Sequence, residues 1–412
     1  MTFVLLLCYL SVVYLRPAEW VPWLLRWQLM DVTMLGVAFF LFLVVAMTKG
    51  SNLVRTPHNR LLVGLFAAII LSHLTNGYVG GLIAATSAFT VNVITYFLIV
   101  NVVNTQRKLQ VSLGVLAVLT SLLAWQGVVQ HATGIGWAGQ WPAENGRITW
   151  IGIFNDPNDL GLAFVIIVPM LLAYIAGPSF IGFKWLPIGL IGLLVYGIYL
   201  TNSRGAMLAL MAAIGYFFIR RSKHRVMGGL MGGALALLFF LFGPSRLGMI
   251  SAEEDSAAGR LDAWYYGFQL LKHRPLFGIG QNMFTNDYPL TAHNSFVLAF
   301  AELGLAGFFC WVGLLYITFK GLLLAEKHPR LSPYALGLGA SLVGFCTAAF
   351  FLSRTYTLLP YLLVALSAAL ANVARVQMPE FAMRFGRADV RNVALACLGL
   401  LVLLQVAMKT WL

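Results

Sequence analysis

Thr291-Ala-His293-Asn-Ser-Phe-Val297 closes a polar interruption, residues 244–294, and opens the next apolar run of a very apolar chain. The interruption also holds Gly259-Arg-Leu-Asp-Ala-Trp264 and His273-Arg-Pro-Leu-Phe-Gly-Ile-Gly280. No other break is as long or gathers Arg, Asp, His and Asn so densely. Loops of this length in compact proteins are usually functional. The apolar runs therefore decide the fold, and the interruption is where chemistry is expected.

The composition indicates a membrane protein. The chain has 412 residues, of which 60% are hydrophobic and 10% charged, with a mean hydropathy of +0.84; this excludes an ordinary soluble domain. A helix crosses a bilayer with about 20 apolar residues. The runs are continuous rather than alternating, so the spans are helices and not barrel strands. We predict an all-α integral membrane protein, a polytopic bundle of 12–13 transmembrane helices with one large loop.

Twelve spans are expected, at 32–48, 61–75, 82–103, 111–129, 159–176, 185–200, 206–219, 226–243, 295–319, 333–352, 357–374 and 392–410. The stretch Met1–Leu15 is a thirteenth candidate, although it is short for a full crossing. It lacks the basic region and cleavage site of a signal peptide. We expect one membrane domain over residues 1–412, without the internal repeat typical of transporters built from duplicated halves.

Charge predicts the orientation. The interruptions fall into two alternating sets, one of which carries 17 of the 27 Lys and Arg residues and only three of the 14 acids. The positive-inside rule places that set in the cytoplasm. The large loop 244–294 and the smaller loop 131–158 therefore face outward. The net charge of +13 is mostly a topology signal, so no nucleic-acid partner is expected.

The cysteines suggest neither a disulfide framework nor a metal site. Cys8, Cys310, Cys346 and Cys397 all lie in predicted spans and form no CxxC pair, so we interpret them as packing residues. No Asp-x-Asp or similar metal-binding arrangement occurs on the outward side. We expect no metal and no other cofactor.

Three arginines are expected at the outward face. Arg204 lies between two spans in Thr201–Gly205, where an ionisable group is either functional or snorkels to the headgroups. Arg260 could bind a ligand, remain solvated, or pair with Asp262. Arg354 stands in the turn between two later spans. Guanidinium groups bind phosphates bidentately and can neutralise a diphosphate leaving group without a metal. The set therefore predicts a diphosphate-binding site.

His293 is the candidate for proton transfer. An imidazole titrates near neutral pH and can take a proton from an attacking hydroxyl. Asn294 is its expected hydrogen-bond partner, and a helix-capping or interface histidine is the alternative. Arg274 follows His273 in a His-Arg-Pro sequence typical of a helix end, where either side chain can cover terminal carbonyls. Glu302 lies about 13 Å deeper on the opposite helix face, so we expect a neutral or hydrogen-bonded structural role.

Two local sequence patterns predict structure in the outward loops. Phe154–Asp159 contains Asn-Asp-Pro-Asn158, which is turn chemistry and can cap the following helix. Within the large loop, Ser251–Gly259 is expected to be mobile. Leu261–Leu271 has helical spacing and could lie on the membrane surface or cap the bundle. Its expected apolar stripe consists of Leu261, Trp264, Tyr265 and Phe268.

These segments together resemble the O-antigen ligase/polymerase superfamily of bacterial envelope glycosyltransferases. The resemblance is clear over residues 150–310, and the motifs occur in the family's order and topology. The matching stretches are Phe154-Asn-Asp-Pro-Asn158, Ser203-Arg-Gly-Ala206, Gly259-Arg-Leu-Asp-Ala-Trp264, His273-Arg-Pro-Leu-Phe-Gly-Ile-Gly280, His293-Asn-Ser-Phe-Val-Leu298 and Glu302-Leu-Gly304.

The resemblance implies transfer of a sugar chain from undecaprenyl diphosphate to an acceptor hydroxyl on the periplasmic face of the bacterial inner membrane. The acceptor would be a glycan, lipid A-core or a protein. By carry-over, Arg204 and Arg260 would bind the diphosphate and His293 would activate or orient the acceptor. Arg354 has no motif counterpart. The residues expected to support the site are Asn158, Asp262, Arg274 and Asn294.

Two departures and several alternatives stay open. A thirteenth segment exceeds the twelve usual in the superfamily, and Tyr14–Trp20 looks more like its exopolysaccharide-associated members. A repeat-unit polymerase or a protein O-oligosaccharyltransferase of the same superfamily would share the donor chemistry. A lipid-linked glycan flippase is the remoter alternative, because it needs polar residues through both leaflets and Glu302 is the only acid inside a predicted span.

Overall fold

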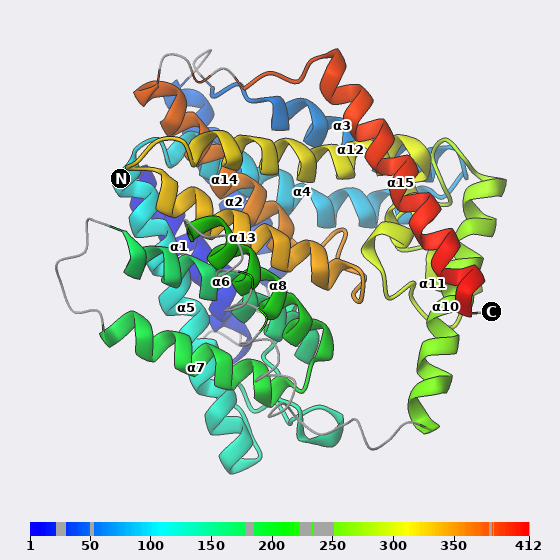
Figure 1. Cartoon of the computed structure of the whole chain (residues 1–412), viewed down its shortest axis with the longest axis horizontal. Coiled ribbons are helices and arrows are strands. Elements are labelled where there is room, and N and C mark those ends of the chain that lie inside the picture. The colour runs from blue at the N-terminus through cyan, green and yellow to red at the C-terminus, as the bar shows by residue number, and fades with distance from the viewer. Residues whose placement is uncertain are drawn as a thin grey trace.

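A computed structural model describes residues 1–21, 30–49, 53–177, 185–222, 229, 233, 251–378, 381 and 383–411 (Figure 1). The longer helices are α1 (Thr2–Leu15), α2 (Met30–Lys49), α3 (Pro57–Leu74), α4 (Val79–Val102), α5 (Gln106–Thr133), α6 (Pro157–Ala176), α7 (Trp185–Thr201), α8 (Arg204–Arg221), α10 (Ser251–His273), α12 (Ser295–Ala325), α13 (Ser332–Ala349), α14 (Leu358–Gln377) and α15 (Arg387–Trp411). The short elements are η1 (Pro17–Glu19), η4 (Glu144–Gly146), η5 (Gly152–Phe154) and α11 (Phe284–Asp287).

The predicted fold class is confirmed. Every predicted span coincides with a helix except 226–243, which lies outside the described residues apart from 229 and 233. Among the described residues, eight helical segments are long and apolar enough to cross a membrane, and one of them is Thr2–Glu19, which joins α1 and η1. Helices α2, α3 and α8 and the shorter apolar α7 occupy further predicted spans. The chain is an all-α polytopic membrane protein.

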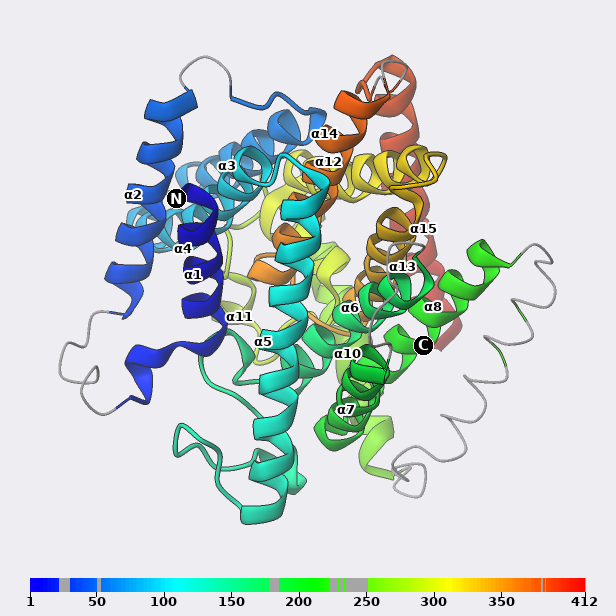
Figure 2. The same cartoon turned by 90° about the vertical axis from the view of Figure 1, so that its left-hand side faces the viewer.

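The helices pack through small residues. Helix α13 packs on α6 and α8, whereas α12 packs on α3, α13 and α14. A Cβ placed on Gly337 of α13 would lie 2.8 Å from Ala173 Cβ of α6, so these two helices approach each other closely. Close approach at small side chains is the usual way in which helices associate in lipid. Helix α1 lies beside α2 and α5 (Figure 2).

The long interruption forms a helix that packs against the bundle. Helix α10 begins at Ser251, so the segment Ser251–Gly259 is helical, and the mobility expected for it stays a prediction. Alanines and acidic residues in the first turns favour a helix start there. The predicted helix Leu261–Leu271 is confirmed as part of α10, which runs crosswise to α12 (Figure 1). Helix α10 packs on α12, as expected of an element that caps the bundle.

A second part of the interruption crosses a break in α12. Gly304 has φ +62° and interrupts the helix, which frees backbone groups on either side. The Leu305 N–H donates to the Pro275 carbonyl at 2.8 Å, and the Gly280 N–H donates to the Glu302 carbonyl at 2.9 Å. A Cβ on Gly278 would lie 2.4 Å from the Glu302 carbonyl, so only glycine fits this crossing. The Gly278-Ile-Gly280 and Glu302-Leu-Gly304 sequences are thus joined by backbone hydrogen bonds.

Candidate functional site

Arg204 is the first residue of α8 and is positioned by the cap of that helix. The Ser203 hydroxyl accepts the Ala206 N–H at 3.3 Å and donates to Asn158 Oδ1 at 2.7 Å. Helices α6 and α8 meet closely here, since a Cβ on Gly161 would lie 2.9 Å from Ala206 Cβ. The start of α8 is therefore fixed to the start of α6.

The start of α6 is organised by Asp156 and Asn158. Asp156 caps the helix, and its Oδ1 accepts the Asn158 N–H at 2.7 Å. This confirms that the Asn-Asp-Pro-Asn turn caps the next helix. Asn158 Oδ1 also accepts Arg147 Nη2 at 2.9 Å, and Arg147 Nε donates to the Thr201 carbonyl at 2.8 Å. The predicted loop 131–158 is thereby tied to both helix starts.

Arg260 lies on the face of α10 that packs against the bundle. Residues one or two positions apart on a helix do not share a face, whereas residues three, four and seven positions apart do. Arg260 therefore shares a face with the buried Ala263, with Trp264 and with Gly267, where an added Cβ would lie 2.5 Å from Val297 of α12. The Trp264 indole N–H donates to the Ala292 carbonyl at 3.0 Å. This bond holds the chain next to His293 against α10, one turn from Arg260.

Asp262 does not pair with Arg260. Residues two apart on a helix do not face each other, and among the described residues no ion pair joins these two side chains. Asp262 is exposed, and its carboxylate adds to the effect of burial in raising the pKa of Tyr288. The predicted apolar stripe is also shifted, because Tyr265 is 54% exposed rather than packed inward.

His293 occupies a left-handed backbone conformation just before α12. Its φ is 47°, a region that histidine adopts more readily than most residues. Asn294, and not His293, caps α12: its Oδ1 accepts the N–H groups of Phe296 at 2.9 Å and Val297 at 3.1 Å. The Asn294 side chain is therefore committed to the helix, and its Nδ2 makes no hydrogen bond within the described residues. The half-buried imidazole of His293 takes no part in this helix cap.

Arg354 is enclosed by protein partners. Its Nε donates to Asp159 Oδ1, its Nη2 to Asp156 Oδ2 at 2.9 Å, and its Nη1 to the Ser353 carbonyl at 3.1 Å. Its backbone N–H donates to Ser295 Oγ at 2.8 Å, which joins the turn to the start of α12. The Arg354 side chain is only 18% exposed. All three guanidinium nitrogens are thus engaged.

Electrostatics place the four predicted side chains in one cluster. Burial and then the neighbouring Arg204 lower the pKa of Arg260. Burial, followed by the charges of Arg260 and Arg354, lowers the pKa of His293, and Asp156 opposes this shift. The lowered pKa favours the neutral imidazole, which can accept a proton. The fold brings Arg204, Arg260, His293 and Arg354 together from four separate segments.

Arg274 does not reach this cluster. It is exposed and lies after the C-terminal end of α10, about 21 Å along the helix axis from Arg260 at 1.5 Å per residue. Glu302 is buried in α12, and its Oε1 accepts the Phe284 N–H at 3.1 Å. That agrees with the hydrogen-bonded structural role expected for it.

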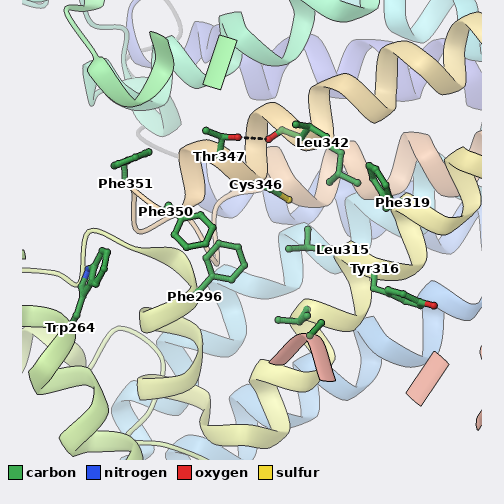
Figure 3. Close-up of a pocket in the computed structure, with 13 residues that line it drawn as sticks. Trp264, Phe296, Leu315, Tyr316, Phe319, Leu342, Cys346, Thr347, Phe350 and Phe351 are labelled. Atoms are coloured by element: carbon green, nitrogen blue, oxygen red, sulfur yellow. Dashed lines mark hydrogen bonds between the residues drawn. The ribbon is translucent and has the colours of Figure 1, made fainter. Parts of the chain in front are cut away.

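An apolar pocket of about 760 Å³ adjoins the cluster (Figure 3). Helices α12 and α13 supply most of its lining, and α15 contributes Ala396. Trp264 and Phe351 lie at one end, and Tyr316 and Phe319 at the other. A Cβ on Gly205 would lie 3.4 Å from Phe351 Cβ, so the first end of the pocket is beside the start of α8. The cationic cluster and the pocket therefore meet.

Sequence reasoning missed the acidic partners of the cluster. Asp156 and Asp159 were interpreted only as turn and cap residues, and Arg147 was not singled out. The signal available was an excess of acids in the outward set, but nothing in the order of residues links Asp159 to Arg354 across 195 positions. Only the packing of α6 beside the α13–α14 turn joins them.

Within the described residues, no three His, Cys, Asp or Glu side chains gather in a way that could hold a metal ion. A comparison with curated proteins gives no match. The model of the O-antigen ligase family matches residues 189–312. The matched segment contains Arg204, Arg260 and His293, whereas Arg354 lies outside it. Residues 189–312 are thus similar to the O-antigen ligase family, and the predicted resemblance to the O-antigen ligase/polymerase superfamily is confirmed over this segment.

Proposed function

We propose that the protein is a bacterial inner-membrane glycosyltransferase. It moves a glycan from undecaprenyl diphosphate to an acceptor hydroxyl on the periplasmic face, in lipopolysaccharide or exopolysaccharide biosynthesis. The observation that carries this proposal is the meeting of the Arg204, Arg260 and His293 cluster with a long apolar pocket. A lipid diphosphate has the same two parts, an anionic head and an apolar chain.

The donor would bind with its head and chain in these two places. The prenyl chain would lie between Trp264 and Phe319, where apolar surface replaces lipid contacts. The diphosphate would lie between Arg204 and Arg260, because two guanidinium groups bind phosphate oxygens through charge-assisted hydrogen bonds. The half-buried position of Arg260 strengthens that attraction, since the local dielectric constant is lower than that of water.

Transfer would proceed as one displacement with inversion. The acceptor oxygen forms a bond to the anomeric carbon while the bond from that carbon to the diphosphate oxygen breaks. The bonding electrons leave with the lipid diphosphate, and the hydroxyl proton passes to the neutral imidazole of His293. Arg204 and Arg260 stabilise the charge that develops on the leaving group, and fixed cations do this without reorganisation or a metal.

The charge distribution along the chain supports a periplasmic position for the cluster. The helix ends that carry Arg204, His293 and Arg354 adjoin the interruptions poor in Lys and Arg. The opposite helix ends carry the basic set, including the Arg220–Glu326 pair. By the positive-inside rule the cluster then faces away from the cytoplasm. A flippase is less well supported, because the described ionisable groups do not line a path through both leaflets.

A purified transfer assay tests the proposal. Labelled polyprenyl-diphosphate oligosaccharide is incubated with the protein in proteoliposomes, and lipid A-core, a second donor molecule and a protein are offered as acceptors. The acceptor that becomes labelled separates ligase, repeat-unit polymerase and protein oligosaccharyltransferase. Passage of the lipid-linked glycan across the bilayer without a new glycosidic bond would favour the flippase instead.

Substitutions of Arg204 and His293 test the roles proposed for these residues. Arg204→Ala is expected to lower kcat/KM about 100-fold through lost charge stabilisation, and His293→Ala about 100-fold or more through lost proton transfer. Glu144→Gln serves as the matched control, because Glu144 is an exposed acid in the smaller outward loop. Wild-type transfer rates in both correctly inserted variants would overturn the proposal.

A further inference from the structure

We infer that Glu302 is a positioning residue that fixes α10, and with it Arg260, against the bundle. This inference rests on the proposed function only where it concerns transfer. Glu302 is 1% exposed, although its neighbours in the chain, Phe300-Ala301 and Leu303-Gly304, are apolar or small. A buried carboxyl is costly unless hydrogen bonds compensate for it, so its partners indicate what it is for.

The partners of Glu302 belong to the segment between α10 and α12. Its Oε1 accepts the N–H of Phe284, the first residue of α11, and its backbone carbonyl accepts the N–H of Gly280. One residue thus holds both ends of the turn 280–284 through side chain and main chain. Asn282 within that turn has φ +62°, a conformation that needs such support.

The same turn supports α10 through aromatic contacts. The Phe284 ring meets Tyr266 of α10 edge-on, with ring centroids 5.4 Å apart. Tyr288 stacks on Tyr266 with centroids 5.0 Å apart and an interplanar angle of 17°. Gly267, the next residue of α10, packs between Phe284 and Val297 of α12. Residues 280–288 therefore form a wedge between α10 and α12.

Glu302 also lies close to the segment that carries Arg354. The Tyr356 hydroxyl is near the Glu302 carboxyl, and within the described part of the chain neither Glu302 Oε2 nor that hydroxyl makes a hydrogen bond. Tyr356 follows Arg354 by two residues, and its carbonyl accepts Asn92 Nδ2 at 2.8 Å. The buried carboxyl consequently stands between the wedge that holds α10 and the turn that carries Arg354.

Arg260 depends on this arrangement. Gly267 and Arg260 are two helical turns apart on one face of α10, about 10.5 Å along its axis. If the wedge loosens, α10 moves and Arg260 shifts relative to Arg204 and His293. Misplacement of a catalytic group by about 1 Å can cost about 100-fold in rate. Glu302 itself has no place in the transfer step.

Hydrogen exchange tests the positioning role without any substrate. Glu302→Ala should speed amide exchange in residues 280–288 and in α10, while α13 and α14 keep wild-type protection. Glu302→Gln keeps an oxygen that can accept the Phe284 N–H, so it should restore most of the protection. Wild-type exchange of α10 in Glu302→Ala would overturn the inference.

Transfer kinetics provide the second measurement. Glu302→Ala should lower kcat/KM about 10- to 100-fold, and Glu302→Gln should rescue it. If Glu302 acts through Arg260, the loss should largely disappear in the Arg260→Ala background, as a double-mutant cycle measures. Additive losses, or a Glu302→Gln protein that is inactive with normal α10 exchange, would each contradict the inference.

A second variant guards against misfolding of Glu302→Ala. Tyr266→Leu removes the stack on the wedge and leaves the carboxyl in place, so it should also speed exchange in α10 and lower transfer. Unchanged exchange and transfer in Tyr266→Leu would contradict the wedge. If the wild-type protein transfers nothing while the exchange results hold, the proposed function fails and the positioning role stands.

Discussion

The Arg354 turn and the Arg260 helix are two regions of one cationic cluster, and they differ in charge balance. Arg354 has two carboxylates, Asp156 and Asp159, within hydrogen-bond reach. Arg260 has a like charge, Arg204, as its electrostatic neighbour, and no acidic side chain among the described residues pairs with it. Removing one partner of a compensated buried pair destabilises the fold, whereas an uncompensated half-buried charge attracts an anion. Arg260, rather than Arg354, is therefore the arginine expected to bind the diphosphate.

The largest expected effect is at Arg260. Arg260→Gln should lower kcat/KM about 100- to 1000-fold, because a fixed positive charge next to the leaving group is lost. Its thermal stability should equal or exceed that of wild type, since the repulsion with Arg204 is relieved. Donor-dependent transfer and thermal unfolding in detergent measure the two quantities. A loss of stability that accounts for the loss of activity would erase the contrast with Arg354.

Arg354 should show the reverse pattern. Arg354→Ala leaves Asp156 and Asp159 without their partner, which should cost about 1–3 kcal/mol once partial exposure is allowed for. Thermal unfolding of the variant checks this, and the Asp159→Asn variant should be destabilised in the same direction. The sequence-based expectation that Arg354 binds the diphosphate predicts instead a raised donor KM with an unchanged melting temperature. The two measurements on one variant separate these roles.

The apolar pocket adds a size test. Ala396 of α15 lines it, so Ala396→Trp should obstruct the prenyl chain and raise KM for a full-length donor about tenfold, the equivalent of a few displaced methylene groups. A donor with a shortened chain should be affected less. Equal effects on both donors would mean that the pocket does not hold the chain. Leu403→Trp, at an exposed position of the same helix, is the control.

The smallest expected effect is a shift in pH dependence. The pKa of His293 lies below its ordinary value of 6.5. The imidazole should therefore stay neutral as the pH is lowered to 6.5, and kcat/KM should decline only at lower pH, in the acid limb of its pH profile, where the imidazole becomes protonated. Removing the positive charge in Arg260→Gln makes protonation of His293 easier, so the limb should move to higher pH. Arg260→Lys keeps the charge and should leave the limb in place. A limb that moves to lower pH in Arg260→Gln would contradict this electrostatic coupling.

Much of the fold could be predicted from local sequence. The span limits followed from hydropathy because the lipid interior requires each segment to satisfy its own backbone. The start of α10 could not be placed, since polar alanine-rich sequence is ambiguous between helix and coil without the packing of α12. The role of Asn294 was also missed, because an Asn before a helix can cap it or contact a neighbour equally well. Gly278 and Gly304 looked like separate turn residues until the crossing of their backbones joined them.

By itself the sequence determined the class of protein and the types of side chain available for chemistry, because hydropathy and residue identity are local properties. Tertiary structure alone decided which arginine is neutralised by acids and which faces another cation. It also decided that Glu302 belongs with the turn 280–284 rather than with His293. These outcomes depend on contacts between segments far apart in the chain, and charge compensation is a property of such contacts, not of the residues taken singly.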